Sequence, residues 1–300
     1  MKHRLKRLLK SFSSIPVDVR DNLPSACMNC GHHTAYMLDP PLVLDFELSR
    51  LPPALRPVFR ERLNGICTAC GIYQSFSRFS DSQIREINAL GKDISTSFEA
   101  FQQYPPSASS VREIDETFYR QRLKQWNAYF SSATQTVKNA LFLRPWFGQA
   151  VKFVLEKWKC DVSGLDMSPI CNRYVQEHFP TYKLLEGFIN GALEGNFVND
   201  KGFDAVFVFH VMTHACDFHK TLQQIRKLVR PNGFALFTHD AMRKPTNPFH
   251  MNHLSEWQFV GFLKQYFSRI DRIDHCTEQP PRYIADFSQK NDDPDFVAWA

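Results

Sequence analysis

The sequence lacks any long run of apolar residues and any strong excess of charge of one sign. Its 36 basic and 31 acidic residues leave a net charge of +5, which is too small for a protein that presents a whole basic face to nucleic acid. Because the basic first residues are not followed by a long apolar segment, we expect them to be neither a secretory signal nor part of a membrane-spanning helix. We therefore expect a cytoplasmic protein, whose oligomeric state the sequence does not indicate.

The first segment, residues 1–26, begins with MKHRLKRLLK and carries much of the basic excess. A short basic amphipathic helix can lie on a membrane surface or on an acidic partner. The simpler interpretation is a solvated helix start.

Eight cysteines would suggest disulfides in a secreted protein, but four of them form the pairs CMNCG and CTACG in a chain without an export signal. Each C-x-x-C turn places two sulfurs on one side of a tight bend, and the following glycine relieves crowding there. The surrounding segment, residues 27–80, is rich in turns and can hardly build its own core. We therefore predict a closed, structural zinc site with the ligands Cys27, Cys30, Cys67 and Cys70.

A redox dithiol is the main alternative for these cysteines. A thioredoxin-like motif, however, would occur once and would lie within a βαβ unit. Two matching motifs in a segment with little periodicity favour the metal.

Beyond this module, residues 81–136 are predicted to be a helical linker, with a long amphipathic helix within residues 111–137. In residues 137–300, strand-like runs alternate with helices of ten to fifteen residues. This order predicts an α/β fold with a doubly wound, mainly parallel sheet. The final segment DFVAWA is predicted to add an edge strand.

An acidic residue ends the second predicted strand of this sheet. In a doubly wound sheet the first strand-to-helix turn lies at the carboxyl edge, where a ligand can approach helix amides. Asp166 is placed there to accept hydrogen bonds from both hydroxyls of a ribose. Taken alone, it could instead cap the following helix.

Three elements in the same order resemble the class I S-adenosylmethionine-dependent methyltransferases. They are GLDMSP at 164–169, FDAVFVFHVMTH at 203–214 and LQQIRKLVRPNGFALFTHD at 222–240. The resemblance implies a Rossmann-like methyltransferase fold and S-adenosylmethionine as cofactor, with Asp166 and Met167 among the residues that bind it.

The first turn departs from the family's G-x-G-x-G pattern. It reads LRPWFG, so Gly148 alone clearly remains, and Arg144 stands where the cofactor's methionine portion normally meets bare backbone. Either Arg144 reaches the cofactor's carboxylate along another path of the loop, or cofactor binding is weak or lost.

Two histidines, His210 and His214, follow the predicted fourth strand at the edge where methyl donor and acceptor should meet. A histidine has a pKa near working pH and can act as general base on a hydroxyl. Each can equally be a hydrogen-bonded structural residue. A second metal at these histidines is disfavoured by the strand-to-helix context.

The whole chain is similar to zinc-containing methyltransferases of sugar-nucleotide and polysaccharide biosynthesis. This resemblance implies a small hydroxylated or glycosyl acceptor, methylated on oxygen or carbon, with the zinc module shaping one wall of its pocket. Two alternatives stay open: an RNA-modifying methyltransferase, and a non-catalytic scaffold of the same fold. RNA is less expected, because basic and aromatic residues are not interleaved.

Overall fold

The structure is a computed structural model, and it describes fourteen parts of the chain, which include most of residues 119–274 and the last strand. The described residues are 17–18, 27, 30, 33–37, 64–70, 73–75, 119–120, 122–131, 136–166, 169–185, 202–215, 218–239, 252–274 and 295–300. The chain forms two compact units. One comprises Met1–Ile87, Met212–His219 and Asp240–Phe262, and the other Asn88–Val211, Lys220–His239 and Leu263–Ala300.

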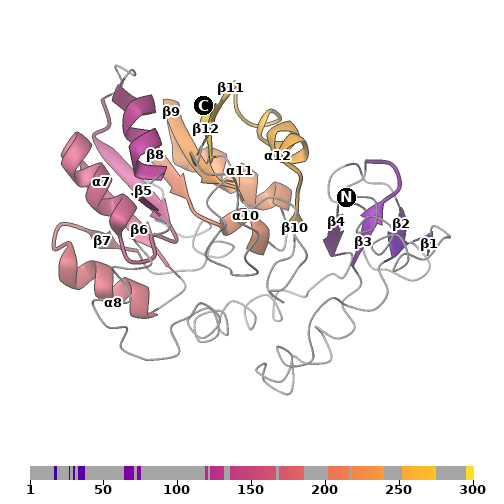
Figure 1. Ribbon diagram of the computed structural model, residues 1–300, viewed down its shortest axis with the longest axis horizontal. Helices are drawn as coiled ribbons and strands as arrows, with labels where there is room; N and C mark the ends of the chain where they lie inside the picture. Colours follow the sequence, from indigo (N-terminus) through magenta and orange to yellow (C-terminus); the bar gives the residue numbers. More distant parts are fainter. Residues whose placement is uncertain are drawn as a thin grey trace. The chain divides into compact units, whose positions relative to one another are not determined.

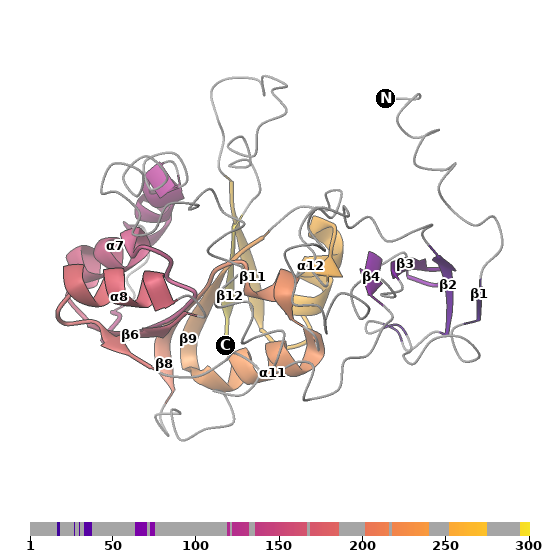
Figure 2. The same cartoon turned by 90° about the horizontal axis from the view of Figure 1, so that it is seen from below.

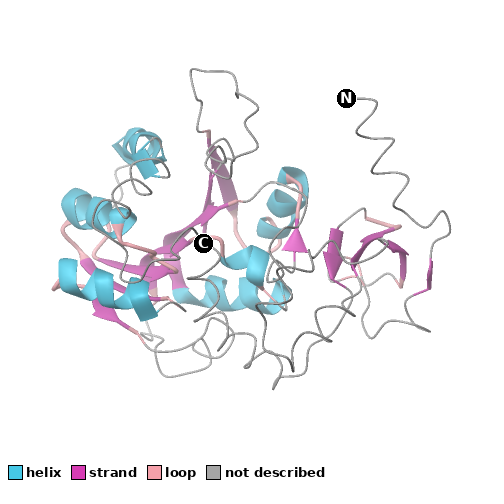
Figure 3. Cartoon of the chain, turned by 60° about the horizontal axis from the view of Figure 1, so that its bottom comes forward, coloured by secondary structure: helices cyan, strands magenta, loops and turns pink. Residues whose placement is uncertain are grey.

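The larger sheet has seven strands in the order β11-β12-β9-β8-β5-β6-β7 (Figure 1). Its strands β5 to β9 pair in parallel, which confirms the predicted doubly wound α/β fold. Figure 3 shows these strands with the helices along them. The strands are β5 (Asn139–Leu143), β6 (Asp161–Leu165), β7 (Lys183–Leu184), β8 (Phe203–Val208), β9 (Val229–Thr238), β11 (Arg269–Ile273) and β12 (Asp295–Trp299).

Five labelled helices connect or follow these strands. They are α7 (Gln149–Trp158), α8 (Pro169–His178), α10 (Val211–His214), α11 (Phe218–Leu228) and α12 (Glu256–Leu263). Helices α7 and α8 lie side by side near β6 (Figures 1 and 2). Among the described helices, none has the length and apolar composition needed to cross a membrane.

An aromatic core joins the sheet to the helical residues 122–131, which lie within the predicted amphipathic helix. Every residue of β8 is buried, as expected for a central parallel strand covered on both faces. Phe207 of this strand stacks on Phe142 at 4.5 Å between ring centroids. Trp126 stacks on Phe209, the residue after β8, at 5.8 Å. Burial of these rings is therefore a main source of stability for this unit.

The last strand, β12, is not at the edge of the sheet, so the prediction for DFVAWA is wrong in position. It pairs antiparallel with β9 on one side and β11 on the other. Four of its five residues are buried, because β11 rather than β12 is the terminal strand. Strand order of this kind cannot be read from hydrophobic periodicity.

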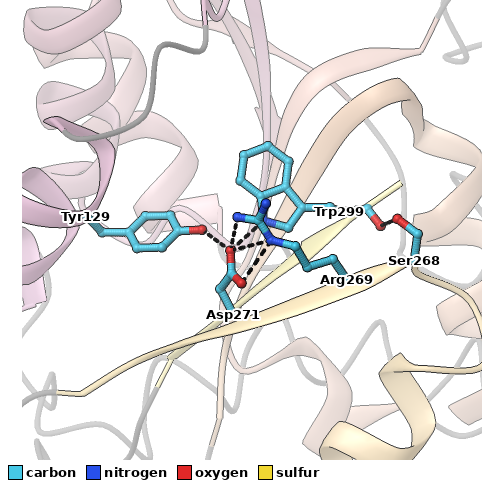
Figure 4. Close-up of polar contacts among 5 residues, drawn as sticks. All are labelled: Tyr129, Ser268, Arg269, Asp271 and Trp299. Atoms are coloured by element: carbon cyan, nitrogen blue, oxygen red, sulfur yellow. Dashed lines mark hydrogen bonds and ion pairs between the residues drawn. The ribbon is translucent and has the colours of Figure 1, made fainter.

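A polar cluster fixes the helical residues 122–131 to strand β11. The hydroxyl of Tyr129 donates to the Asp271 carboxylate, and the indole Nε1 of Trp299 donates to it at 2.9 Å (Figure 4). Arg269 also binds this carboxylate and lies over the Trp299 ring at 4.9 Å. The cluster joins three segments that are far apart in sequence.

The smaller sheet has the order β1-β2-β3-β4-β10 and contains the segments that carry the paired cysteines. Its first four strands come from the predicted zinc module and the segment before it, whereas β10 comes from the later half of the chain. Its described pairings are all antiparallel: β1 with β2, β2 with β3, β3 with β4 and β4 with β10. The strands are β1 (Val17–Asp18), β2 (Thr34–Met37), β3 (Asn64–Cys67), β4 (Tyr73–Ser75) and β10 (Asn252–His253).

Candidate functional site

The structure brings the four paired cysteines together. Their sulfurs all lie within 4.8 Å of one another, and the Cys27–Cys70 and Cys30–Cys67 distances are 3.6 Å each. Cys67 ends β3, and its partner in the antiparallel register is Ala35 of β2. The antiparallel pairing of β2 with β3 therefore helps to bring the two C-x-x-C turns together.

These sulfur positions fit a tetrahedral metal ion. A zinc ion with four thiolates at about 2.3 Å requires sulfur-to-sulfur distances of about 3.8 Å, close to the contacts observed. Burial raises the pKa of the Cys67 thiol, so a thiolate there needs a cation to offset its desolvation. Cys27 is also buried, at 3% exposure. The four side chains could hold zinc as a closed set.

A second group of predicted site residues lies at the carboxyl edge of the larger sheet, in the turn between β5 and α7. Arg144, Trp146 and Gly148 all have positive φ angles, of 62°, 53° and 84°. The Arg144 amide donates to the Leu165 carbonyl at 2.8 Å, and the Gly148 amide donates to Pro145 at 3.0 Å. Two non-glycine residues in the left-handed region indicate a turn held in a strained conformation.

Gly148 is required by packing against the segment that follows α8. A Cβ atom at this position would lie 2.5 Å from the Phe179 ring and 3.3 Å from Val175. The positive φ angle adds a second reason for glycine here. Its predicted contact with the cofactor stays a prediction, and the structure gives a separate cause for its identity.

Asp166 lies directly after β6 and is 8% exposed. Its Oδ2 accepts a hydrogen bond from the Trp146 amide at 3.2 Å, which ties it to the β5–α7 turn. The Asn172 side chain donates to its carbonyl at 2.9 Å. Asp166 thus lies at the end of β6 and contacts the turn after the neighbouring strand β5, while its role at the ribose stays a prediction.

Arg144 places a buried guanidinium at this edge. The residue is 4% exposed, and its Nη1 donates to the His210 carbonyl at 3.2 Å. Its Nε has no hydrogen-bond partner, and no acidic side chain among the described residues forms an ion pair with it. A buried cation left without a counter-charge costs several kcal/mol. Among the described residues, no carboxylate offsets the charge of Arg144, and an anionic group would stabilise it.

His210 lies at the end of β8, two residues after Val208, and is partly exposed. Its amide donates to the Thr238 hydroxyl at 2.9 Å, and its ring lies 6.2 Å from that of Trp146. The backbone of His214 lies in α10, but its side chain is outside the described part of the chain. Met167 also lies outside the described residues.

Two residues that sequence reasoning missed surround these predicted side chains. Trp146 binds Asp166 through its amide and lies beside His210. Asn172 fixes the Asp166 backbone from α8. A tryptophan in the turn after the first predicted strand was a signal in the sequence for the first. The sequence held no comparable signal for Asn172.

Comparison with known families identifies the central part of this unit. Residues 147–237 match the family described as methyltransferase domain. The matched segment includes Gly148, Asp166 and His210. The match supports the predicted enzyme class, a methyltransferase, for this segment of the chain. No curated protein sequence matches the chain significantly.

Solved structures show the same fold at low sequence identity. One is a chain of the complex between the Haloferax volcanii Trm112 methyltransferase activator and a methyltransferase, with a TM-score of 0.52 and 12% identity over 65% of this chain and 94% of that one. Another is the CurJ carbon methyltransferase, with a TM-score of 0.50 and 11% identity over 75% and 72% of the two chains. These similarities establish the fold alone.

Proposed function

We propose that the protein transfers a methyl group from S-adenosylmethionine to a small hydroxylated or glycosyl acceptor, and that the four-cysteine cluster binds a structural zinc ion. The observation that supports cofactor binding most directly is the buried Arg144 guanidinium without an acidic partner among the described residues. The matched methyltransferase domain supports the reaction type.

Arg144 has the chemistry to hold the carboxylate of the cofactor's amino-acid portion. A guanidinium binds a carboxylate through two parallel hydrogen bonds, which are strongest where water is excluded. The Nη1 contact to the His210 carbonyl fixes the direction of the side chain. The N–H of Nε stays available for a hydrogen bond to a ligand. In this chain, arginine thus takes over a role that backbone amides of a glycine-rich turn would have.

Asp166 fits the ribose of the same cofactor. A carboxylate accepts several hydrogen bonds at once, and this one is held by the Trp146 amide and, through its backbone, by Asn172. Because Asp166 follows β6 and Arg144 follows β5, neighbouring parallel strands present both groups at one edge. An elongated ligand with hydroxyls at one end and a carboxylate at the other matches this pair.

His210 is the proposed general base. S-adenosylmethionine, when bound, supplies a methyl group on a positively charged sulfur. The imidazole of His210 is partly exposed at the strand end, so it can take a proton from an acceptor hydroxyl that is positioned for in-line attack. His214 is the second candidate. His210→Asn or His214→Asn should lower turnover without changing cofactor affinity.

The acceptor class rests on the resemblance of the whole chain to zinc-containing sugar-modifying methyltransferases. An RNA acceptor is the second candidate, and it predicts binding of RNA that weakens steeply with salt. Absence of such binding favours the small acceptor. A location in the cytoplasm stays a prediction.

Isothermal titration of the full chain tests the cofactor site. S-adenosylhomocysteine carries both the ribose and the amino-acid carboxylate, whereas methylthioadenosine lacks the amino-acid portion. We expect wild-type protein to bind S-adenosylhomocysteine saturably. Arg144→Gln should raise the dissociation constant of S-adenosylhomocysteine at least about tenfold, since a charged hydrogen bond contributes about 1.5–3 kcal/mol. The dissociation constant of methylthioadenosine should stay the same.

Arg272→Gln is the matched control, because Arg272 is half exposed on β11 and pairs with Asp274. This variant should bind both ligands as wild type does. If folded wild-type protein binds neither ligand, the cofactor proposal is wrong and a scaffold function is favoured. If Arg144→Gln weakens both ligands equally, the assignment of the carboxylate to Arg144 is wrong.

A further inference from the structure

Helix α10 is too short to be stable by itself. It contains four residues, Val211–His214, and a helix of this length cannot offset the cost of its nucleation. The last carbonyls of a helix lie beyond the reach of its own amides, and here the amide of Ala215, just after the helix, donates to the Met212 carbonyl at 3.4 Å. Contacts from outside the helix can therefore stabilise its end.

The side chain of Asn252 holds that end. Its Nδ2 donates to the Met212 carbonyl at 3.1 Å and to the Ala215 carbonyl at 2.6 Å. Asn252 is only 3% exposed, so water does not compete effectively for these carbonyls. Because a carboxamide nitrogen carries two hydrogens, both donations can form at once. The residue acts as a C-terminal cap supplied from a distant part of the chain.

The backbone of Asn252 belongs to the sheet that carries the cysteines. Asn252 and His253 form β10, which pairs antiparallel with β4 in the register Asn252 to Gln74 and His253 to Tyr73. Tyr73 follows the second C-x-x-C turn by three residues. One short strand therefore connects the cysteine cluster to the end of α10.

A second contact joins the same parts. Ser255 and Gln258 form a capping box at the start of α12, in which each backbone amide donates to the other's side chain, at 3.0 and 3.3 Å. This box fixes the Gln258 carboxamide, whose Nε2 donates to the Cys70 carbonyl at 3.4 Å. The segment that contains Asn252 is thus attached to β4 by strand pairing and to the second cysteine turn by the Gln258 side chain.

We propose that Asn252 is a positioning residue: through its carboxamide, zinc binding at the four cysteines orders α10, the helix that begins directly after His210. This inference rests on the proposed zinc site and methyl transfer. It gives the zinc ion a role beyond the cysteine turns, in ordering the segment that follows His210 in the chain. The metal itself stays closed to substrate.

Hydrogen exchange of the full chain, measured by mass spectrometry, tests the proposal. Asn252→Asp keeps the shape of the side chain but replaces the donor with a charged acceptor. We expect exchange in the peptide covering residues 211–219 to rise about tenfold, with no change in β5. EDTA treatment of wild-type protein should produce the same rise. Treatment of Asn252→Asp should add little, because both changes break one connection.

Asn232→Asp is the matched control. It makes the same chemical change at an exposed residue of β9, away from the contacts between Asn252 and α10. It should exchange as wild type does. Zinc content and S-adenosylhomocysteine affinity equal to wild type show that each variant is folded.

Three outcomes would overturn the inference: unchanged exchange in residues 211–219 of Asn252→Asp, unchanged exchange on zinc removal, or effects of the two that simply add. Different results would contradict the proposed function. A purified chain without zinc, or one that does not bind S-adenosylhomocysteine, contradicts that proposal whatever Asn252→Asp does.

Discussion

The indole Nε1 of Trp126 donates a 2.8 Å hydrogen bond to the Asp295 carboxylate, between residues 169 positions apart. Both side chains are fully buried. Arg122 lies 3.5 Å from the other oxygen of this carboxylate. The bond fixes the helical residues 122–131 to the start of β12, and the same indole stacks on Phe209, the residue before His210.

Removal of this hydrogen bond should destabilise the protein. Trp126→Phe keeps an aromatic ring but removes the only donor of the indole, so a buried carboxylate loses a partner. We expect the free energy of unfolding in urea to fall by about 1.5–3 kcal/mol. Trp257→Phe is the control, because Trp257 is 85% exposed, and its stability should match wild type. Equal effects of the two substitutions would contradict this role of Trp126.

The hydroxyl of Tyr129 should ionise at an unusually high pH. Burial, together with its hydrogen bond to Asp271, raises the pKa of Tyr129 to about 12 from an ordinary 10.0 (Figure 4). The unfolded chain then loses this proton first, so the stabilising contribution is complete below about pH 10 and is lost as pH rises towards about 12. Ultraviolet titration of the wild type should show a tyrosine that ionises near pH 12, and Tyr129→Phe should lack this ionisation. Tyr266→Phe, a change outside the cluster, should keep it.

Zinc content should depend on the paired cysteines alone. Purified wild-type protein should contain about one zinc ion per chain, as expected for four thiolate ligands. Cys67→Ser should lose most of the metal and unfold the cysteine-bearing sheet before the larger one. Cys160→Ser, which replaces a buried cysteine just before β6, should keep its zinc. Elemental analysis of the three proteins distinguishes a zinc site from a chance cluster of thiols.

Cofactor affinity should depend on Asp166 more than on other acids of the same strand. Asp166→Asn replaces an oxygen acceptor with a donor, so the dissociation constant of S-adenosylhomocysteine should rise about tenfold to a hundredfold. Asp161→Asn changes the exposed residue at the other end of β6 and should bind normally. Titration calorimetry measures both, and thermal unfolding checks that each is folded. Equal affinities would contradict the ribose role.

Sequence order predicted the parallel part of the fold well, because each strand and helix there has its own hydrophobic pattern. The acid after β6 and the histidine after β8 follow from that order, since strand ends meet at one edge. The interior position of β12 does not follow from it, nor does the addition of β10 to the cysteine-bearing sheet. Both depend on pairing between distant segments, which local periodicity does not encode.

The turn after β5 also contains a feature that the sequence could not predict, the environment of the Arg144 side chain. The sequence indicated that Arg144 replaces an expected small residue. It could not indicate that the guanidinium is buried with its Nε unpartnered, because burial here depends on β6 and β8. Asn252 is similar: a lone asparagine gives no signal until its two carbonyl partners are located.

The interior position of β12 also affects the order in which the sheet can form. Strands β9 and β11 flank β12 but precede it in the sequence, so until residues 295–299 are made each lacks the neighbour with which it pairs in the folded sheet. Unpaired strand edges invite pairing with other chains. Residues 295–299 therefore join β11 to the parallel strands and cover an edge of each of their two neighbours.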